Sequence, residues 1–253
     1  MLWLRSLAFE IGRGFLILFF SVTAQLLWFA PYSLRYRYLS YWSRANLAWL
    51  RWTCGLSYRL HGTEHIQADN PALVLAHHES AWETFSMQVI FPRQSYVLKK
   101  ELLSIPFFGW TLAMLKQIAI DRSAGRSALK HLVQQGRQRL LEQKDWVILV
   151  PEGTRVKPGT VGKINKGGAL LAKATSVPIH FVSHNAGQFW PKNSLLRKPG
   201  VIDFYISPLV QTEDLTVDEI NRLARQWFQH QNLDLAAPSL AQPQHAEDSK
   251  PYE

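Results

Sequence analysis

Apolar and polar positions follow two different periods along most of this chain. From Leu56 onward, short apolar runs alternate with stretches in which apolar residues recur every three or four positions. Short runs indicate buried strands, whereas the longer period indicates helices with one apolar face. The runs predict seven strands, at 58–62, 72–76, 95–98, 117–120, 146–150, 178–183 and 201–207. The periodic stretches predict helices at 82–90, 108–115, 123–142, 167–175 and 216–231.

Strands that alternate with helices are typical of an α/β fold, with a sheet covered on its faces. We therefore expect one α/β domain over residues 57–235. Thr216-x-x-Glu219 predicts a capping box at the start of the last helix. Residues 236–253 are rich in Ala, Pro, Gln and charged residues, which predicts a disordered tail.

The first 56 residues have a different pattern. Residues 14–32 carry no charge, contain only Gln25 as a polar amide and are limited by Pro31. As a helix, this run would measure about 28 Å, close to the roughly 30 Å hydrocarbon core of a bilayer. Its apolar side chains would contribute roughly −5 kcal/mol to insertion. Residues 36–55 predict a second, amphipathic helix along the membrane surface, so residues 1–56 are expected to be a membrane-associated helical segment.

Aromatic and basic residues support this assignment. Five of the ten tryptophans lie in residues 1–56, as in an aromatic belt at the level of lipid headgroups. The arginines after the apolar run are Arg35, Arg37, Arg44 and Arg51, and those before it are Arg5 and Arg13. This bias predicts that the downstream domain faces the cytoplasm. A cleaved signal peptide is the alternative, with Val22-Thr23-Ala24 as the small-residue site, but bulky apolar residues continue beyond it.

Composition narrows the class of partner. A formal net charge of +9 favours acidic partners, namely nucleic acid, anionic lipid or phosphorylated substrates. The aromatic residues cluster in the apolar N-terminus instead of interleaving with basic residues, so a nucleic-acid-binding module is disfavoured. The single cysteine, Cys54, excludes an internal disulfide.

Candidate chemistry gathers where the second predicted strand ends. His78 follows that strand and precedes a predicted helix, a position at the mouth of a sheet. Glu83 is five residues further on. Its carboxylate can accept from one imidazole nitrogen while the other nitrogen takes a proton from a hydroxyl. Two alternatives remain: Ser80-x-x-Glu83 is also a capping-box pattern, and His77-His78 is a pair of possible metal ligands without a third at the usual spacing.

Three further motifs follow in order: Ile-Ala-Ile-Asp-Arg at 118–122, Val-Pro-Glu-Gly-Thr-Arg at 150–155 and Val-Pro-Ile at 177–179. Together with His78-x4-Glu83, they resemble the four motifs of the glycerolipid acyltransferases, above all the bacterial 1-acylglycerol-3-phosphate acyltransferases, over about residues 60–210. That family usually has Asp in place of Glu83 and Asn in place of His77. The resemblance implies a mixed sheet covered by helices, with the acyltransferase domain at 57–235, preceded by a membrane-associated helical pair.

The resemblance also implies roles for individual residues. His78 is expected to be the general base, with Glu83 as its acidic partner. The acceptor phosphate is expected to bind at Arg122, Glu152, Gly153, Thr154 and Arg155, and the acyl chain near Pro178. Guanidinium groups grip phosphate with paired hydrogen bonds, and a glycine lets backbone N–H groups come close.

The implied reaction moves a fatty acyl group from acyl carrier protein (ACP) or coenzyme A (CoA) to a lysophospholipid hydroxyl. The favoured acceptor is 1-acylglycerol-3-phosphate, which would give phosphatidic acid. No metal and no cofactor beyond the acyl-ACP or acyl-CoA co-substrate is expected, and the expected partners are membrane lipids and the thioester carrier, not nucleic acid. The expected location is the bacterial inner membrane.

Two other activities are compatible with these residues. One is acyl transfer to another lysolipid, and the other is a lipid esterase or thioesterase. A hydrolase of that kind needs its own nucleophile, but the chain has no Gly-x-Ser-x-Gly elbow and Ser80 is the only serine close to His78. The acceptor headgroup, the donor carrier and the oligomeric state are left open by the sequence.

Overall fold

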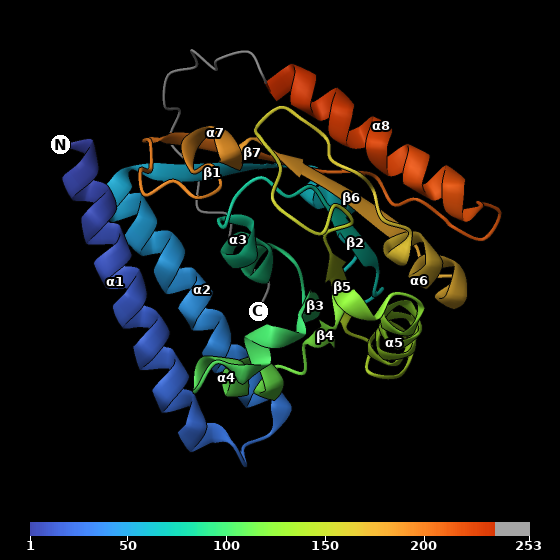
Figure 1. The fold of residues 1–253 in the computed structure, drawn as a ribbon, viewed down its shortest axis with the longest axis horizontal. Helices are drawn as coiled ribbons and strands as arrows, with labels where there is room; N and C mark the ends of the chain where they lie inside the picture. The colour runs from blue at the N-terminus through green and yellow to red at the C-terminus, as the bar shows by residue number, and fades with distance from the viewer. Residues whose placement is uncertain (236–253) are drawn as a thin grey trace.

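The computed structural model describes residues 1–235, so the predicted disordered tail lies outside the described residues. Seven strands form a single sheet in the order β1-β7-β6-β2-β5-β3-β4 (Figure 1). The strands are β1 Leu56–His61, β2 Leu73–Ala76, β3 Gln94–Lys99, β4 Ile118–Ile120, β5 Trp146–Leu149, β6 Ile179–His184 and β7 Gly200–Ile206. All neighbouring pairs are parallel except β6 and β7, which are antiparallel. The mixed sheet is confirmed, and all seven predicted strands are present.

Helices cover both faces of this sheet (Figure 1). They are α1 Leu2–Thr23, α2 Tyr32–Cys54, α3 Glu83–Ile90, α4 Phe108–Met114, α5 Arg126–Arg137, α6 Gly167–Thr175, α7 Ala186–Phe189 and α8 Val217–Leu235. One core lies between the sheet and α1, α2 and α3, and the other lies between the sheet and α5, α6 and α8. Strand β2 supplies Val74 and Ala76 to the first core and Leu73 and Leu75 to the second. Because its side chains alternate between two covered faces, the whole strand reads as apolar.

Within the α/β domain, one helix prediction needs correction and one short helix was not predicted. The expected helix 123–142 is divided: Gly125 has a φ of +52°, α5 begins after it, and the helix ends in a π-helical turn over Gln138–Glu142. The four-residue α7 was not predicted, because one turn is too short to show a period. The capping box of α8 is confirmed, since Thr216 N donates to Glu219 Oε2 at 2.8 Å and Glu219 N donates to Thr216 Oγ1 at 3.2 Å.

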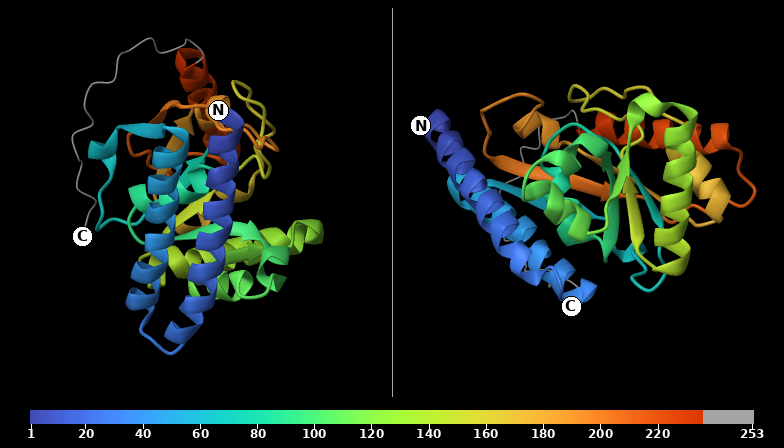
Figure 2. Two further views of the ribbon diagram at one scale, coloured as in Figure 1. Left: turned by 90° about the vertical axis from the view of Figure 1, so that its left-hand side faces the viewer. Right: turned by 60° about the horizontal axis from the view of Figure 1, so that its bottom comes forward.

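The N-terminal segment is a pair of adjacent helices, α1 and α2, which run side by side (Figure 2). The expected single helix over 14–32 is wrong at both ends. Helix α1 begins at Leu2, continues as a 3-10 helix over Ala24–Leu27 and stops before Pro31, which disfavours helical backbone at the preceding residue. By length and composition, Leu2–Leu27 is able to cross a membrane. The predicted second helix is confirmed as α2.

The helical pair packs directly on the sheet. Phe9 of α1 and Leu50 of α2 are buried in the same core as strand residues of the first face. The Phe9 ring meets the Trp190 ring edge-on, with 5.4 Å between centroids. Trp49 of α2 donates its indole N–H to the carbonyl of Phe9 at 3.2 Å. The helical pair and the sheet therefore form one packed unit.

Candidate active site

The predicted site residues meet at one edge of the sheet. Strand β2 pairs in parallel with β5 on one side and with β6 on the other. The carboxyl ends of the three strands therefore lie together. The candidate residues His78 and Glu152 follow β2 and β5, and His184, which was not predicted, is the last residue of β6. In open α/β sheets, ligands bind at this edge.

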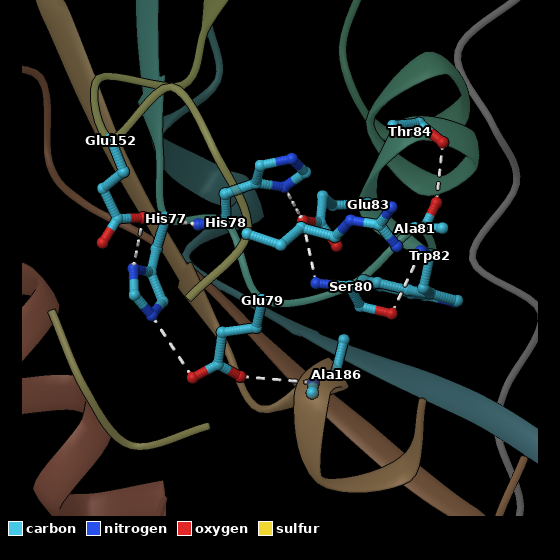
Figure 3. A network of polar contacts seen from close by, with 12 residues as sticks. His77, His78, Glu79, Ser80, Ala81, Trp82, Glu83, Thr84, Glu152 and Ala186 are labelled. Atoms are coloured by element: carbon cyan, nitrogen blue, oxygen red, sulfur yellow. Dashed lines mark hydrogen bonds and ion pairs between the residues drawn. The ribbon is translucent and has the colours of Figure 1, made fainter. Parts of the chain in front are cut away.

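His78 and Glu83 are in contact. Glu83 is the first residue of α3 and is buried, and its Oε1 atom accepts hydrogen bonds from His78 Nδ1 and, at 3.2 Å, from Ser80 N (Figure 3). The His78 side chain is 19% exposed, and its other ring nitrogen points away from Glu83. One nitrogen is thus held by the acid, while the other is directed outward to take a proton. The same carboxylate oxygen accepts from Ser80 N, but Ser80 is not the N-cap of α3 and its hydroxyl does not bond Glu83 N, so the capping box is not complete.

The environment of Glu83 favours its ionised form. Burial alone would raise the pKa of this carboxyl, but the facing His184 and the bond with His78 outweigh burial, so its pKa lies below the ordinary value. The carboxylate is therefore charged at neutral pH and is able to stabilise a positive charge on His78.

Ser80 has no arrangement suited to a nucleophile. It is buried, its hydroxyl donates to the carbonyl of Trp190 at 2.7 Å, and it accepts from Trp82 N at 3.2 Å. The hydroxyl proton is committed to a main-chain acceptor and faces no base. The hydrolase alternative therefore loses its only serine candidate.

The N–H groups of the Ser80 turn are also engaged. Ser80 N donates to Glu83, Trp82 N donates to Ser80 Oγ, and His78 N donates to Glu152 at 2.9 Å. The sequence leaves two kinds of oxyanion donor open, the N–H groups of this turn or a nearby basic side chain, and the existing bonds disfavour the N–H groups. A basic side chain at the rim of the site is the better donor.

Glu152 lies beneath the site instead of facing the acceptor. Its Oε2 atom is 3.0 Å from His77 Nδ1 and accepts from His78 N, and its Oε1 atom accepts from Gly162 N at 2.8 Å. The residue ties the loop after β5 to the loop that carries His78. These contacts favour a positioning role over the acceptor contact that the resemblance implied.

His77 joins two buried carboxylates. Its Nδ1 faces Glu152, and its Nε2 is 3.3 Å from Glu79 Oε1. Burial alone would lower the pKa of His77, but the bonds to Glu152 and Glu79 outweigh it and raise the pKa to about 9. His77 is therefore an imidazolium at neutral pH. Its two nitrogens lie against carboxylates, and within residues 1–235 no group of three or more His, Cys, Asp or Glu side chains is arranged to hold a metal ion.

Glu79 was missed by sequence reasoning. Its carboxylate accepts from Gly159 N at 3.0 Å and from Gly187 N at 3.2 Å, so it binds two further loops to the His77 ring. A single glutamate next to a histidine carries no periodic signal, and its partners lie 80 and 108 residues away.

The candidate phosphate-binding residues come together at the rim. Arg122 Nη1 donates to the carbonyl of Gly153, which has a φ of +71° that favours glycine. Lys192 adds a third cation, because its Nζ atom donates to Thr154 Oγ1 at 3.1 Å and to the carbonyl of Arg155 at 3.3 Å. Lys192 belongs to no motif and was not predicted.

This basic turn lies directly beside the base. Val156 N donates to the carbonyl of His78 at 2.8 Å, so the residue that follows Arg155 is bonded to the main chain of His78. The turn that carries the candidate phosphate-binding residues and the candidate base are therefore adjacent.

Pro178 does not join the others. It immediately precedes β6, and its carbonyl accepts from Leu73 N at 3.0 Å, at the start of β2. The site is at the other end of these strands, and the four residues from Pro178 to Val182 span about 13 Å. The structure does not place Pro178 beside His78, and its role near the acyl chain stays a prediction.

Comparisons with known proteins agree with this geometry. The family model described as Acyltransferase matches residues 57–185. The chain is 39% identical over 223 residues to a 1-acyl-sn-glycerol-3-phosphate acyltransferase of Pseudomonas aeruginosa, covering 87% of this chain and 86% of that one. It is 29% identical over 195 residues to the enzyme of the same name from Saccharomyces cerevisiae, covering 74% of this chain and 63% of that one.

The fold is shared with a solved structure. This chain matches the crystal structure of the 1-acyl-sn-glycerophosphate (LPA) acyltransferase PlsC from Thermotoga maritima with a TM-score of 0.76. The match covers 94% of this chain and 97% of that one at 20% identity.

Proposed function

We propose, given that this chain belongs to the Acyltransferase family and is an O-acyltransferase, that it acylates 1-acyl-sn-glycerol-3-phosphate to give phosphatidic acid. One observation carries this choice: the hydrogen bond between Val156 N and the His78 carbonyl, which sets the Arg155 turn beside the base. In the proposed acceptor, the free hydroxyl is on the carbon next to the one that bears the phosphate. An adjacent base and phosphate site fit that spacing.

The proposed reaction is a direct transfer. The outer nitrogen of His78 takes the proton of the acceptor hydroxyl as its oxygen attacks the thioester carbonyl, and Glu83 stabilises the resulting imidazolium. The tetrahedral intermediate then collapses, the carbon–sulfur bond breaks, and the leaving thiolate takes the proton from His78. The ester and the free thiol are the products, without an acyl-enzyme.

Basic side chains at the rim are proposed to bind the phosphate. Arg122 and Arg155 are the residues suited to paired hydrogen bonds with phosphate oxygens, and Lys192 adds a point charge beside them. Thr154 lies with them on the same exposed turn. Glu152 is proposed to hold this turn and the His78 loop in place from below.

We further propose that the enzyme works at a membrane. Both the acceptor and its product are lipids, and helix Leu2–Leu27 is apolar and long enough to enter a bilayer. Apolar side chains exposed along this segment are Leu4, Ile11, Phe15, Leu18 and Leu26, and Phe29 is exposed in the turn that follows it. The arginine bias supports a bacterial inner membrane with the site on the cytoplasmic side, where acyl-ACP and acyl-CoA are available as donors.

An acceptor panel tests this proposal. The purified enzyme is incubated with labelled acyl-ACP or acyl-CoA and with lysolipids that carry phosphate, choline, ethanolamine or no headgroup. We expect acylation of the phosphate-bearing acceptor to exceed that of the others. Free fatty acid released without any acceptor would indicate a hydrolase, and equal use of the headgroup-free lipid would overturn the phosphate site.

A further inference from the structure

Glu83 has a second oxygen that the proposed mechanism does not use. The Oε2 atom is buried and has no hydrogen-bond partner among the residues that the structure describes. The Nε2 atom of His184 lies 3.7 Å from it, beyond hydrogen-bond distance. His184 is the last residue of β6, and both side chains are fully buried. A buried carboxylate oxygen without a donor carries a large desolvation cost, so the group that faces it affects how stable the ionised form of Glu83 is.

The hydrogen bonds of His184 define its tautomer. Ala186 N donates to its Nδ1 at 3.3 Å, so Nδ1 carries no proton. Its Nε2 is 3.2 Å from the carbonyl of His77, which only accepts, so Nε2 carries the proton. Burial lowers the pKa of His184 despite the nearby carboxylates, which is consistent with a neutral ring. The single N–H of this ring therefore points into the space between the His77 carbonyl and Glu83 Oε2.

Packing prevents this ring from turning away. The His184 ring stacks on Phe204 of β7, with 6.0 Å between centroids and 7° between planes. The Trp82 ring contacts it at 5.9 Å and 69°. Because the ring is confined by two large aromatic neighbours, its N–H is a fixed donor.

We propose that His184 is a positioning residue that holds the Glu83 carboxylate, and through it His78, from the side opposite to the substrate. The three side chains form a row in which His78 contacts one oxygen of Glu83 and His184 faces the other. The same N–H also anchors the carbonyl of His77, the residue before the base. This inference rests on the proposed roles of His78 and Glu83.

The groups around Glu83 determine how its removal affects the pH profile. Glu83 is faced by His78 from the loop after β2, by His184 from β6 and by Tyr96 from β3. His184 is itself faced by Glu79 and His77 in addition to Glu83 and His78. His184 is one of the groups that lower the pKa of Glu83, together with His78, so loss of its N–H should raise this pKa. The acid limb of kcat/KM then moves to higher pH, because the ionised carboxylate is the working form.

The test compares His184→Leu with His184→Gln. Leucine removes the N–H that faces Glu83 Oε2 and bonds the His77 carbonyl, and we expect kcat to fall roughly 10- to 100-fold, the scale for buried polar groups left without a partner. The acceptor KM should hardly change, since the phosphate-binding turn is untouched. Glutamine offers an amide N–H at a similar reach and should restore most of kcat and return the acid limb toward its original pH.

His180→Leu is the matched control. His180 is also a fully buried histidine of β6, but it bonds the carbonyl of Ser207 and stacks on Trp146, away from Glu83. If His184→Leu and His180→Leu lower kcat equally, with equal losses of Tm and unmoved pH profiles, His184 is only a packing residue and the proposal is overturned.

A spectroscopic measurement on the unmodified chain covers the case in which His184→Leu does not fold. With 15N-labelled histidine, the proton of His184 should be found on Nε2, and its resonance should shift in Glu83→Gln. A proton on Nδ1, or a resonance indifferent to Glu83→Gln, would overturn the inference. Loss of all acyl transfer in His78→Ala, measured on whichever acceptor the panel identifies, tests the proposed function separately.

Discussion

The site edge of the sheet and the outer surface of the N-terminal helices are unusual in opposite ways: the first buries charged side chains, and the second exposes apolar ones. At the site edge, Glu79, Glu83 and Glu152 are buried carboxylates, and each is bonded to a histidine. In the helical pair, α1 is long and apolar, and Phe29 in the turn that follows it is 97% exposed. Buried charges and large exposed apolar patches are both unusual in soluble proteins.

The buried carboxylates and the exposed apolar side chains are stabilised in different ways, and this difference distinguishes the two regions. The buried charges are neutralised within the chain, by partners that the fold itself supplies, as expected for a rigid site. The exposed apolar side chains of the hairpin have no such partners on the described part of the chain, so their compensation must come from outside it. This contrast fits the proposal that the site edge carries the chemistry and that the helical pair contacts a lipid surface.

Removal of the base should have the largest effect on the first region. We expect His78→Ala to lower turnover on the order of 10²- to 10⁴-fold. His78→Asn keeps an N–H toward Glu83 but offers no base, so it should show the same loss with a nearly unchanged Tm. Initial rates with labelled thioester and thermal unfolding measure the two quantities, and near-normal turnover of either variant would defeat the assignment.

The His77 cluster should make stability depend on pH. The pKa of His77 is raised from about 6.5 to about 9 in the folded chain. The stabilisation is therefore complete below about pH 6.5 and is lost as pH rises through about 9, an effect on the order of 3 kcal/mol. The free energy of unfolding at pH 6.5 and pH 9.5 measures it.

His77→Asn is the control for that pH dependence, since asparagine does not titrate. The stability difference between the original chain and His77→Asn should shrink as pH rises over this range. A difference that stays constant or grows would show that His77 is neutral in the folded protein.

Loss of one rim cation should weaken acceptor binding without removing the base. We expect Arg155→Ala to raise the KM for 1-acylglycerol-3-phosphate roughly 10-fold or somewhat more, with a much smaller change in kcat. Lys130→Ala, an exposed cation on α5 at the other face of the sheet, serves as the control. If the KM for the phosphate-bearing acceptor is unchanged in Arg155→Ala, the phosphate role is wrong.

The smallest effect is expected at the outer surface of the helices. Phe29→Ser should lower partition into anionic vesicles by roughly tenfold or less, because one apolar side chain leaves the lipid. Its Tm in detergent should stay the same, since the ring makes little contact with the protein. Leu129→Ser on α5 is the matched control. Equal vesicle binding by Phe29→Ser and the original chain would argue against contact between this tip and the membrane.

Local sequence patterns predicted the strands and the contact between His78 and Glu83, because burial of a strand and pairing across a short loop depend on short stretches of chain. Strands β2 and β5 are wholly buried, so their apolar runs stand out without any knowledge of their neighbours. The pairing of His78 with Glu83 also depends only on a loop of a few residues and the start of a helix.

The start of α1 shows why other features escaped prediction. Arg5, Glu10 and Arg13 argue against extending an apolar helix toward the N-terminus. In the fold, Glu10 pairs with Arg13 and with Arg197, and Arg5 donates to the carbonyl of Thr53 at 2.6 Å. Glu10 and Arg13 are close in sequence, but Arg197 and the carbonyl of Thr53 are far away, and no short window of sequence contains those two partners.

The sequence by itself determined the seven strands and most of the helices, which histidine meets which acid across one loop, and which motifs identify the family. Only the tertiary structure decided that Glu152 points inward, that Lys192 joins the phosphate turn and that His184 faces the second oxygen of Glu83. The physical reason is the strand order β6-β2-β5, which differs from the order in the chain. A hydrophobic pattern records that a strand is buried, but not which strand lies beside it.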